Sequence, residues 1–138
     1  MTEPEPRLPA GAESVSRGGF NLFAGPFWRL SVDDDGMGAR YGFIALPKHM
    51  NSADSLHGGL LMTFADVAMS RTARLVASVE ACNTVSLTAD FVGPGKLGEL
   101  IEAQVRITRR TRSVIFQSAT ITVGDRVLMT ATGLWKID

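Results

Sequence analysis

Apolar residues recur at helical spacing from Gly59 to about Glu80, and no proline interrupts this stretch. The repeat is carried by Leu60, Leu61, Phe64, Ala68, Leu75 and Val79. A helix of this length would span about 35 Å, which is longer than a small domain usually needs. We therefore expect the rest of the chain to wrap around one long helix.

On both sides of that helix the pattern changes to alternation of apolar and polar residues, which predicts strands at 27–32, 39–46, 83–92, 99–108, 114–123 and 127–137. Turn residues such as Asp33 to Gly36 and Gly124-Asp125 separate them. In 83–92 one parity is apolar, which predicts one buried face carrying Val85, Leu87, Ala89 and Phe91. Because the links are short, we expect an antiparallel sheet with the helix on one face.

Such a sheet leaves one edge strand open. An open edge exposes unpaired backbone groups, and pairing with a second copy of the chain would satisfy them. The pattern therefore predicts a homodimer that pairs these edges or buries the remaining face of the helix.

The N-terminal residues differ in composition from the rest of the chain. Residues 1–17 hold three of the six prolines together with Gly, Ser and Glu, which predicts a flexible tail. Residues 18–138 then form one domain, which begins with an aromatic segment, Gly18 to Trp28. We expect this segment to form a helical turn or loop at the mouth of a pocket.

Charge and cysteine content narrow the function classes. The 14 basic and 14 acidic residues cancel, so no overall field favours nucleic acid or an anionic membrane. With one cysteine, Cys82, and two histidines, we expect no internal disulfide and no metal site. The three aspartates from Asp33 to Asp35 are too few for a calcium loop and fit a turn. Without a signal peptide or a long apolar span, a cytoplasmic location is expected.

The junction from Asn51 to Asp66 is the best candidate for chemistry. A polar loop passes through Gly58-Gly59 into the helix, whose first N–H groups are unpaired at the positive end of the helix dipole. A carbonyl oxygen gaining negative charge would be stabilised there. Asp66 is the only carboxylate between Asp54 and Glu80. A carboxylate among apolar residues is costly unless it has a hydrogen-bonding or charged partner or a functional role. Alternatively, Asp66 begins a solvated stripe with Ser70 and Arg74, and the glycines serve only a tight turn.

The spacing Asn51-x5-His57-Gly58-Gly59-x6-Asp66 resembles the signature of hotdog-fold acyl-CoA thioesterases of the phenylacetate-degradation type. The run from Val92 to Glu99 is similar to that family's link between strands, and the resemblance covers about residues 40 to 137. It implies an α+β hotdog fold, in which an antiparallel six-stranded sheet wraps around one central helix. It also implies dimers or dimers of dimers, with active sites at the subunit boundary.

The resemblance assigns a role to each residue of the motif. Asp66 would be the catalytic carboxylate, as nucleophile or as general base on water, and the Gly58 N–H would polarise the thioester carbonyl. Asn51 would orient water or the carboxylate of the facing subunit, and the Thr84 hydroxyl would assist. His57 is either a catalytic base or the residue that holds the loop. No Gly-x-Ser-x-Gly elbow, which would indicate a serine triad, is present.

Substrate contacts are expected on both sides of this junction. Gly59 and Met62 would contact the substrate, and the apolar residues Met62, Met69, Phe20, Phe23 and Trp28 are candidates for lining an acyl pocket. The coenzyme A phosphates would be bound by a basic cluster, in which Arg106 on one strand joins the residues of the next turn, Arg109, Arg110, Arg112 and Ser113. The same arginines would also fit a solvated hairpin tip, and Thr111 departs from the family's usual glycine.

Three functions follow from these observations. The first is hydrolysis of an aryl- or medium-chain acyl-CoA to the free acid and coenzyme A, which requires no cofactor apart from the coenzyme A of the substrate. The second is a non-catalytic acyl-CoA-binding or regulatory module on the same fold. The third, a hotdog dehydratase or hydratase, would need a catalytic histidine and carboxylate in motifs that this sequence lacks.

Overall fold

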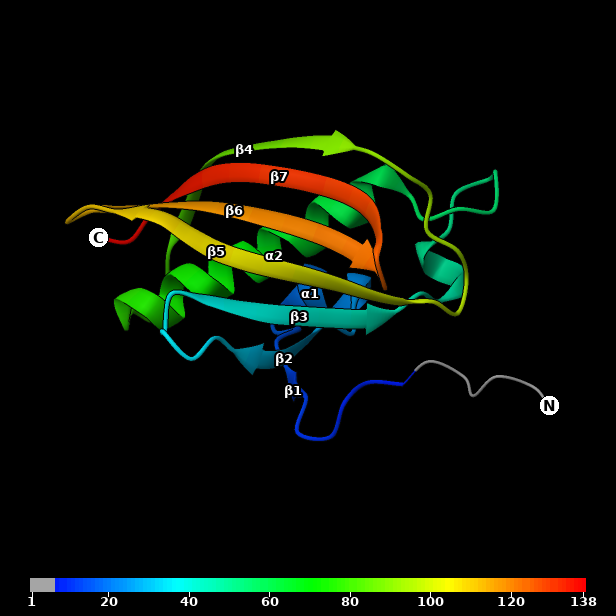
Figure 1. The fold of residues 1–138 in the computed structure, drawn as a ribbon, viewed down its shortest axis with the longest axis horizontal. Helices are drawn as coiled ribbons and strands as arrows, with labels where there is room; N and C mark the ends of the chain where they lie inside the picture. Colours follow the sequence, from blue (N-terminus) through cyan, green and yellow to red (C-terminus); the bar gives the residue numbers. More distant parts are fainter. Residues whose placement is uncertain (1–6) are drawn as a thin grey trace.

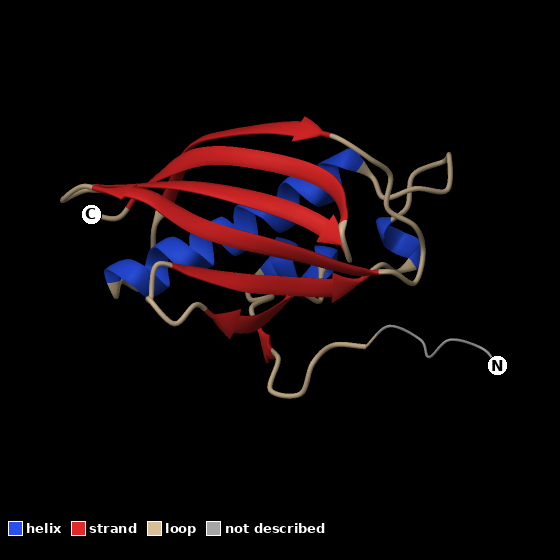
Figure 2. Ribbon diagram, viewed as in Figure 1, coloured by secondary structure: helices blue, strands red, loops and turns tan. Residues whose placement is uncertain are grey.

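A computed structural model describes residues 7–138. Seven strands form one antiparallel sheet in the order β1-β2-β3-β5-β6-β7-β4, and the long helix α2 lies behind it (Figures 1 and 2). The elements are β1 (Glu13–Ser14), α1 (Gly19–Ala24), β2 (Trp28–Val32), β3 (Gly38–Ile44), a 3-10 turn (Pro47–His49), α2 (Gly58–Ala77), β4 (Asn83–Phe91), β5 (Leu100–Arg110), β6 (Val114–Val123) and β7 (Arg126–Lys136). This arrangement confirms the predicted hotdog fold.

Helix α2 ends about three residues earlier than its periodicity predicted. Ser78 adopts a left-handed conformation with φ of 55°, and its N–H bonds to the carbonyls of Arg74 and Leu75. A left-handed residue closes a helix because it turns the last N–H groups back onto free carbonyls. The apolar face of α2 is buried against the sheet, through Leu61, Phe64, Ala65, Ala68, Met69 and Ala73.

The core between α2 and the sheet is built from alternating inward residues of β5, β6 and β7 and from aromatic rings. Phe64 of α2 lies edge to face against Phe43 of β3, with ring centres 4.7 Å apart. The ring of Phe27 packs against both of these rings, with its centre 5.3 Å from each of theirs. Edge-to-face packing of this kind adds directional contacts to burial, so these three rings fix α2 against the start of the sheet.

The expected buried face of β4 forms only in part. Leu87 and Ala89 are half-buried, but Val85 and Phe91 are 59% and 57% exposed. The reason is that β4 is the last strand of the sheet and pairs only with β7, with an irregularity between Thr84 and Ser86. An alternating pattern does not reveal whether a strand lies at an edge.

The N-terminal boundary of the domain also needs correction. Residues from Glu13 to Ser16, predicted as part of a tail ending at residue 17, pack on the sheet instead. Glu13 and Ser14 pair with β2 as a seventh strand, and Val15 is buried with its N–H bonded to the Phe27 carbonyl. The domain therefore begins by Glu13 rather than Gly18, because a two-residue strand is too short to show alternation. Residues 1–6 of the expected tail lie outside the described residues.

Candidate active site

Within residues 7–138, one N–H group in the first turn of α2 has no acceptor. The Gly59 N–H donates to Nδ1 of His57 at 2.9 Å. The N–H groups of Leu60 and Leu61 donate to the His57 carbonyl at 3.0 and 3.1 Å. For the Gly58 N–H no acceptor is found among residues 7–138. A free donor at the positive end of a helix is suited to stabilise a developing oxyanion.

His57 is the N-terminal cap of α2. Because its Nδ1 accepts a hydrogen bond, the hydrogen of the neutral ring lies on Nε2. The ring is exposed, and Nε2 has no partner within the described part of the chain. This geometry agrees with the alternative in which His57 holds the loop, and its role as a catalytic base stays a prediction.

Asn51 organises the loop that leads to His57. Its Oδ1 accepts the N–H groups of Ala53 and Ser55 at 2.8 and 3.1 Å, and its Nδ2 donates to Oγ of Ser55 at 3.1 Å. These bonds give the loop a fixed shape at the approach to α2. That Asn51 also orients water or a facing carboxylate stays a prediction.

Asp66 lies two turns into α2 and faces the edge strand. Oγ1 of Thr84 donates to Oδ1 of Asp66 at 2.6 Å, which brings these two predicted site residues together. Oδ2 of Asp66 has no partner among residues 7–138. The neighbouring Ser70 accepts from Nε1 of Trp135 at 2.9 Å. This side of α2 therefore faces β4 and β7 and is not simply a solvated stripe.

Gly58 lies beside Phe91, the last residue of β4. A Cβ at Gly58 would be 3.4 Å from the nearest atom of the Phe91 ring, which is ordinary contact. Met62, one turn after Gly58, is half-buried. The start of α2 thus lies next to the exposed end of β4.

The arginine turn lies at the other end of α2 (Figure 1). Nη1 of Arg110 donates to the carbonyl of Val76 at 3.2 Å, while Arg109 and Arg112 are exposed. Thr111 closes the turn without a glycine, because its Oγ1 accepts the Val114 N–H at 3.0 Å. Ser113 is half-buried, and its carbonyl accepts the Ile137 N–H at 3.0 Å.

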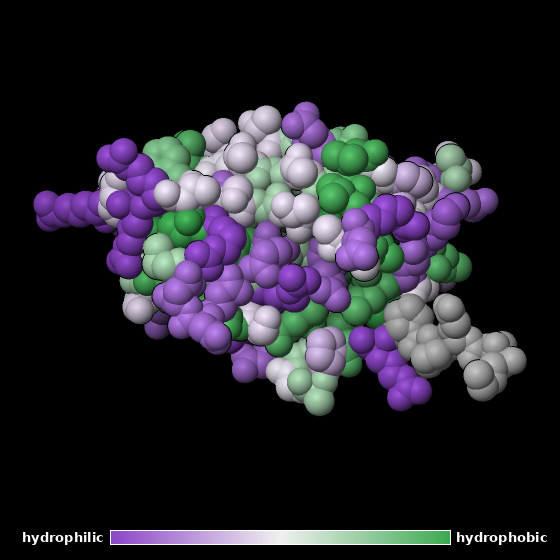
Figure 3. Space-filling model, in the orientation of Figure 1, coloured by the Kyte–Doolittle hydropathy of each residue, from purple (hydrophilic) through white to green (hydrophobic). Residues whose placement is uncertain are grey.

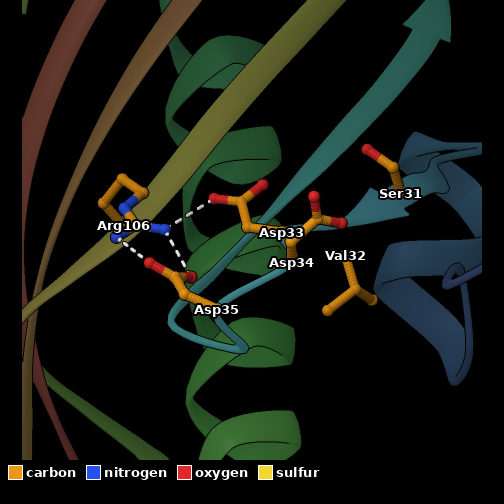
Figure 4. A pocket seen from close by; sticks show the side chains of 6 residues that line it. All are labelled: Ser31, Val32, Asp33, Asp34, Asp35 and Arg106. Carbon is orange, nitrogen blue, oxygen red and sulfur yellow. Dashed lines mark hydrogen bonds and ion pairs between the residues drawn. The ribbon is translucent and has the colours of Figure 1, made fainter.

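Arg106 does not belong to that arginine group. It lines an open hollow of about 600 Å³. Figure 4 shows its guanidinium bonded to Asp33 and Asp35 of the β2–β3 turn. Its guanidinium donates to Asp33 at 2.9 Å and to Asp35 at 2.7 Å. The hydrogen bond from Arg106 lowers the pKa of Asp35 to about 2. The aspartates are therefore turn residues, as predicted. Two of them, Asp33 and Asp35, form ion pairs with Arg106.

Two further polar groups have structural partners that the sequence did not reveal. Nε2 of His49 donates to the carbonyl of Ala24 at 2.7 Å, and Nδ1 accepts the Leu46 N–H at 3.0 Å. Burial lowers the pKa of this imidazole. Burial also raises the pKa of the Cys82 thiol, which donates to the Ser70 carbonyl.

Of the five residues expected around an acyl pocket, only Phe20 and Phe23 line the cavity beside the start of α2. Met69 is fully buried in the core, and Trp28 is a half-buried residue of β2. Helical spacing placed Met69 on the core face of α2, where no ligand reaches it.

No helix in the part that the structure describes is long and apolar enough to cross a membrane. Within residues 7–138, His, Cys, Asp and Glu side chains do not gather in threes where a metal ion would fit.

Comparison with known proteins places this geometry in context. The sequence pattern of the thioesterase superfamily matches residues 54–131, which include the start of α2 and Asp66. The Pseudomonas aeruginosa protein PA0474, named as a candidate esterase, is 31% identical over 91 residues, which are 65% of this chain and 68% of that protein.

Two solved structures share the fold. Zebrafish thioesterase superfamily member 2 superposes with a TM-score of 0.80 at 16% identity, over 90% of each chain. The Escherichia coli PaaI protein of the phenylacetic acid degradation operon gives a TM-score of 0.73 at 20% identity, over 81% of this chain and 79% of that one. The superfamily match spans more than half of the sequence, and the chain belongs to the thioesterase superfamily and is a thioester hydrolase.

Proposed function

We propose that the protein hydrolyses an aryl- or medium-chain acyl-CoA thioester to the free acid and coenzyme A. The Gly58 N–H polarises the thioester carbonyl, and Asp66 acts as nucleophile or as general base on water. The proposal rests on the hydrogen bonds at the start of α2. Among residues 7–138, the other N–H groups of the first turn have acceptors and the Gly58 N–H has none, so this group can bind an oxyanion.

Gly58 and Asp66 of one chain are too far apart to act on one carbonyl. They are separated by eight residues of helix, or about 12 Å along the axis. A reacting group has to lie within about 3 Å of its target. Asp66 therefore acts together with the Gly58 N–H of a second copy, and the active enzyme is a homodimer or a dimer of dimers.

The open edge of β4 supports a particular pairing of the two copies. Thr84 near one end of β4 bonds to Asp66, and Phe91 at the other end touches the Gly58 position. Antiparallel pairing of two β4 strands about a two-fold axis near Leu87 sets Thr84 of each copy opposite Phe91 of the other. This pairing brings Asp66 of each copy toward Gly58 of the other, which forms two equivalent sites.

The exposed apolar residues at this edge favour such a dimer. Val85, Phe91 and Val92 are between 57% and 59% exposed. Figure 3 shows hydrophobic atoms gathered near the end of β4. Covering these side chains with a second copy removes apolar surface from water and pairs the open backbone edge at the same time.

The proposed reaction follows from these positions. In the general-base route, the free Oδ2 of Asp66 takes a proton from water, and the resulting hydroxide attacks the thioester carbon. The carbonyl oxygen becomes an oxyanion at the Gly58 N–H. Collapse of this intermediate breaks the carbon–sulfur bond, and the departing thiolate takes the proton back from Asp66. In the nucleophilic route Asp66 itself attacks the thioester carbon, and cleavage of the carbon–sulfur bond releases the thiolate and leaves an anhydride. Water then hydrolyses the anhydride, which restores the Asp66 carboxylate, releases the acid and supplies the proton that the thiolate takes up. In both routes Thr84 fixes the carboxylate.

The nucleotide end of coenzyme A is assigned to the arginine turn. Arg110 bonds to Val76, which lies about 15 Å along α2 from Asp66 but about 27 Å from Gly58 of the same chain. In a site shared by two copies, the nearer arginines therefore come from the copy that supplies Asp66. Arginine forks suit phosphate groups, and Arg109 and Arg112 are exposed.

A panel of acyl-CoA substrates with a thiol-trapping reagent tests the proposal. We expect coenzyme A release from at least one aryl- or medium-chain member and a loss of about 100-fold or more in kcat for Asp66→Asn. Asparagine keeps an oxygen that accepts from Thr84, so the fold should be unaffected. No release from any member, or undiminished release by Asp66→Asn, would contradict the proposal.

A further inference from the structure

An apolar cavity of about 410 Å³ lies beside the start of α2. Its apolar lining comes from α1, from the loop before α2 and from α2 itself, and consists of Phe20, Phe23, Ala24, Met50 and Leu60. The volume is in the range of small-molecule sites. Nothing in the reaction described above uses this cavity.

The cavity adjoins the group that polarises the carbonyl. His57 and Gly59, which flank Gly58 in sequence, both line it, and Thr63 extends the lining one turn further along α2. A thioester with its carbonyl oxygen at the Gly58 N–H therefore has its acyl carbon at the edge of the cavity. The acyl chain would run along α2 from Gly59 to Thr63, a distance of about 6 Å.

Helix α1 is held in place as one wall of the cavity. Nζ of Lys48 donates to the carbonyl of Phe23 at 2.7 Å. Nε2 of His49 donates to the carbonyl of Ala24, also at 2.7 Å. These two side chains donate to carbonyls at the end of α1. The last carbonyls of a helix need such donors because no N–H group of the helix itself reaches them. A helix of six residues would not keep its position alone.

The aromatic residues of this wall are exposed in the free protein. Phe20 and Phe23 are 66% and 77% exposed, although both line the cavity. An apolar acyl group that enters would cover them. The Lys48 ammonium, which also lines the cavity, donates one of its hydrogen bonds to the Phe23 carbonyl.

We propose that α1 forms the specificity-determining wall of a pocket for apolar acyl groups, with Phe20 and Phe23 setting the size of the group accepted. The proposal rests on the proposed function for the position of the carbonyl. Lys48 and His49 hold α1 in place through their hydrogen bonds to the Phe23 and Ala24 carbonyls, and both also line the cavity.

Binding and turnover separate this inference from the proposed function. In the Asp66→Asn protein, calorimetric titration with octanoyl-CoA and acetyl-CoA measures the contribution of the acyl chain without hydrolysis. We expect Phe23→Ala, added to Asp66→Asn, to weaken octanoyl-CoA binding by about tenfold and to leave acetyl-CoA binding unchanged, because an acetyl group is too short to reach α1. In the protein with Asp66 intact, the kcat/KM values for the two substrates should change in the same way.

Leu22→Ala is the matched control, since Leu22 is also on α1 and 66% exposed but does not line the cavity. It should alter neither affinity. A narrower cavity in Phe23→Trp should reduce kcat/KM for octanoyl-CoA and spare acetyl-CoA. If Phe23→Ala and Leu22→Ala give the same octanoyl-to-acetyl ratio in both assays, the inference is wrong. Absence of turnover in the unaltered protein would instead overturn the proposed function. The titration would still show whether the acyl chain binds against α1.

Discussion

Replacement of Gly58 by proline removes one hydrogen atom from the proposed oxyanion site and little else. Gly58 is the first residue of α2, where proline is favoured because its fixed φ suits a helix start and its missing N–H has no helical partner. The preceding residue, His57, has an extended conformation with φ of −63° and ψ of 132°, which a following proline permits. We therefore expect the free energy of unfolding to change by less than about 1 kcal/mol.

The effect on catalysis should be much larger. Loss of a single oxyanion donor raises the activation barrier by about 2.7–4 kcal/mol, or about 100- to 1000-fold in kcat. Gly58→Ala is the matched variant, because it retains the N–H, and its methyl group would meet the Phe91 ring at an ordinary 3.4 Å. Steady-state kinetics by thiol trapping, with thermal unfolding as a check on the fold, compares the two variants. If Gly58→Pro retains kcat within about threefold of Gly58→Ala, the Gly58 N–H is not the polarising group.

Two other predictions concern hydrogen bonds seen in the structure. Thr84→Val removes the donor to Asp66 and should lower kcat by about tenfold or more, whereas Thr84→Ser, which keeps the hydroxyl, should restore it; equal rates in the two variants would count against this role. The pKa of buried His49 is lowered below its ordinary 6.5, so the neutral ring stabilises the fold fully above about pH 6.5 and less as the pH falls toward the folded-state pKa. Denaturant unfolding between pH 5 and 8 should show that the free energy of unfolding decreases as the pH falls, and that it decreases less in His49→Gln. The same pH dependence in both proteins would refute this prediction.

The local periodicity of apolar residues was sufficient to predict most elements of the fold. The long helix and six strands were predicted because each has its own repeat and each is bounded by turn residues. Properties that depend on the order of strands were not predictable in this way. The exposure of Val85 and Phe91 follows from the place of β4 at the sheet edge, and the pairing of Glu13 with Arg29 involves a strand of two residues.

For the candidate site, the motif predicted Asp66 and the resemblance added Thr84. The structure joins these two residues by one hydrogen bond, and their catalytic roles stay predictions. The resemblance to the family pointed to Gly58 as the donor, but the residues alone gave no physical reason to prefer it to Gly59. The cap by His57, which occupies the Gly59 N–H, supplies that reason. The bonds from Lys48 and His49 to α1 join residues 25 positions apart, and no local pattern encodes them.

The central claim is that each site takes its carboxylate from one chain and its amide from another. A mixture of two inactive proteins, Asp66→Asn and Gly58→Pro, tests it most directly after dissociation and reassembly in equal amounts. Half of the dimers would then be mixed, and each mixed dimer would contain one intact site of two, so we expect recovery of about a quarter of the unaltered activity. Activity that stays at the level of the separate variants would show that the two groups do not meet across a dimer, and would contradict the account.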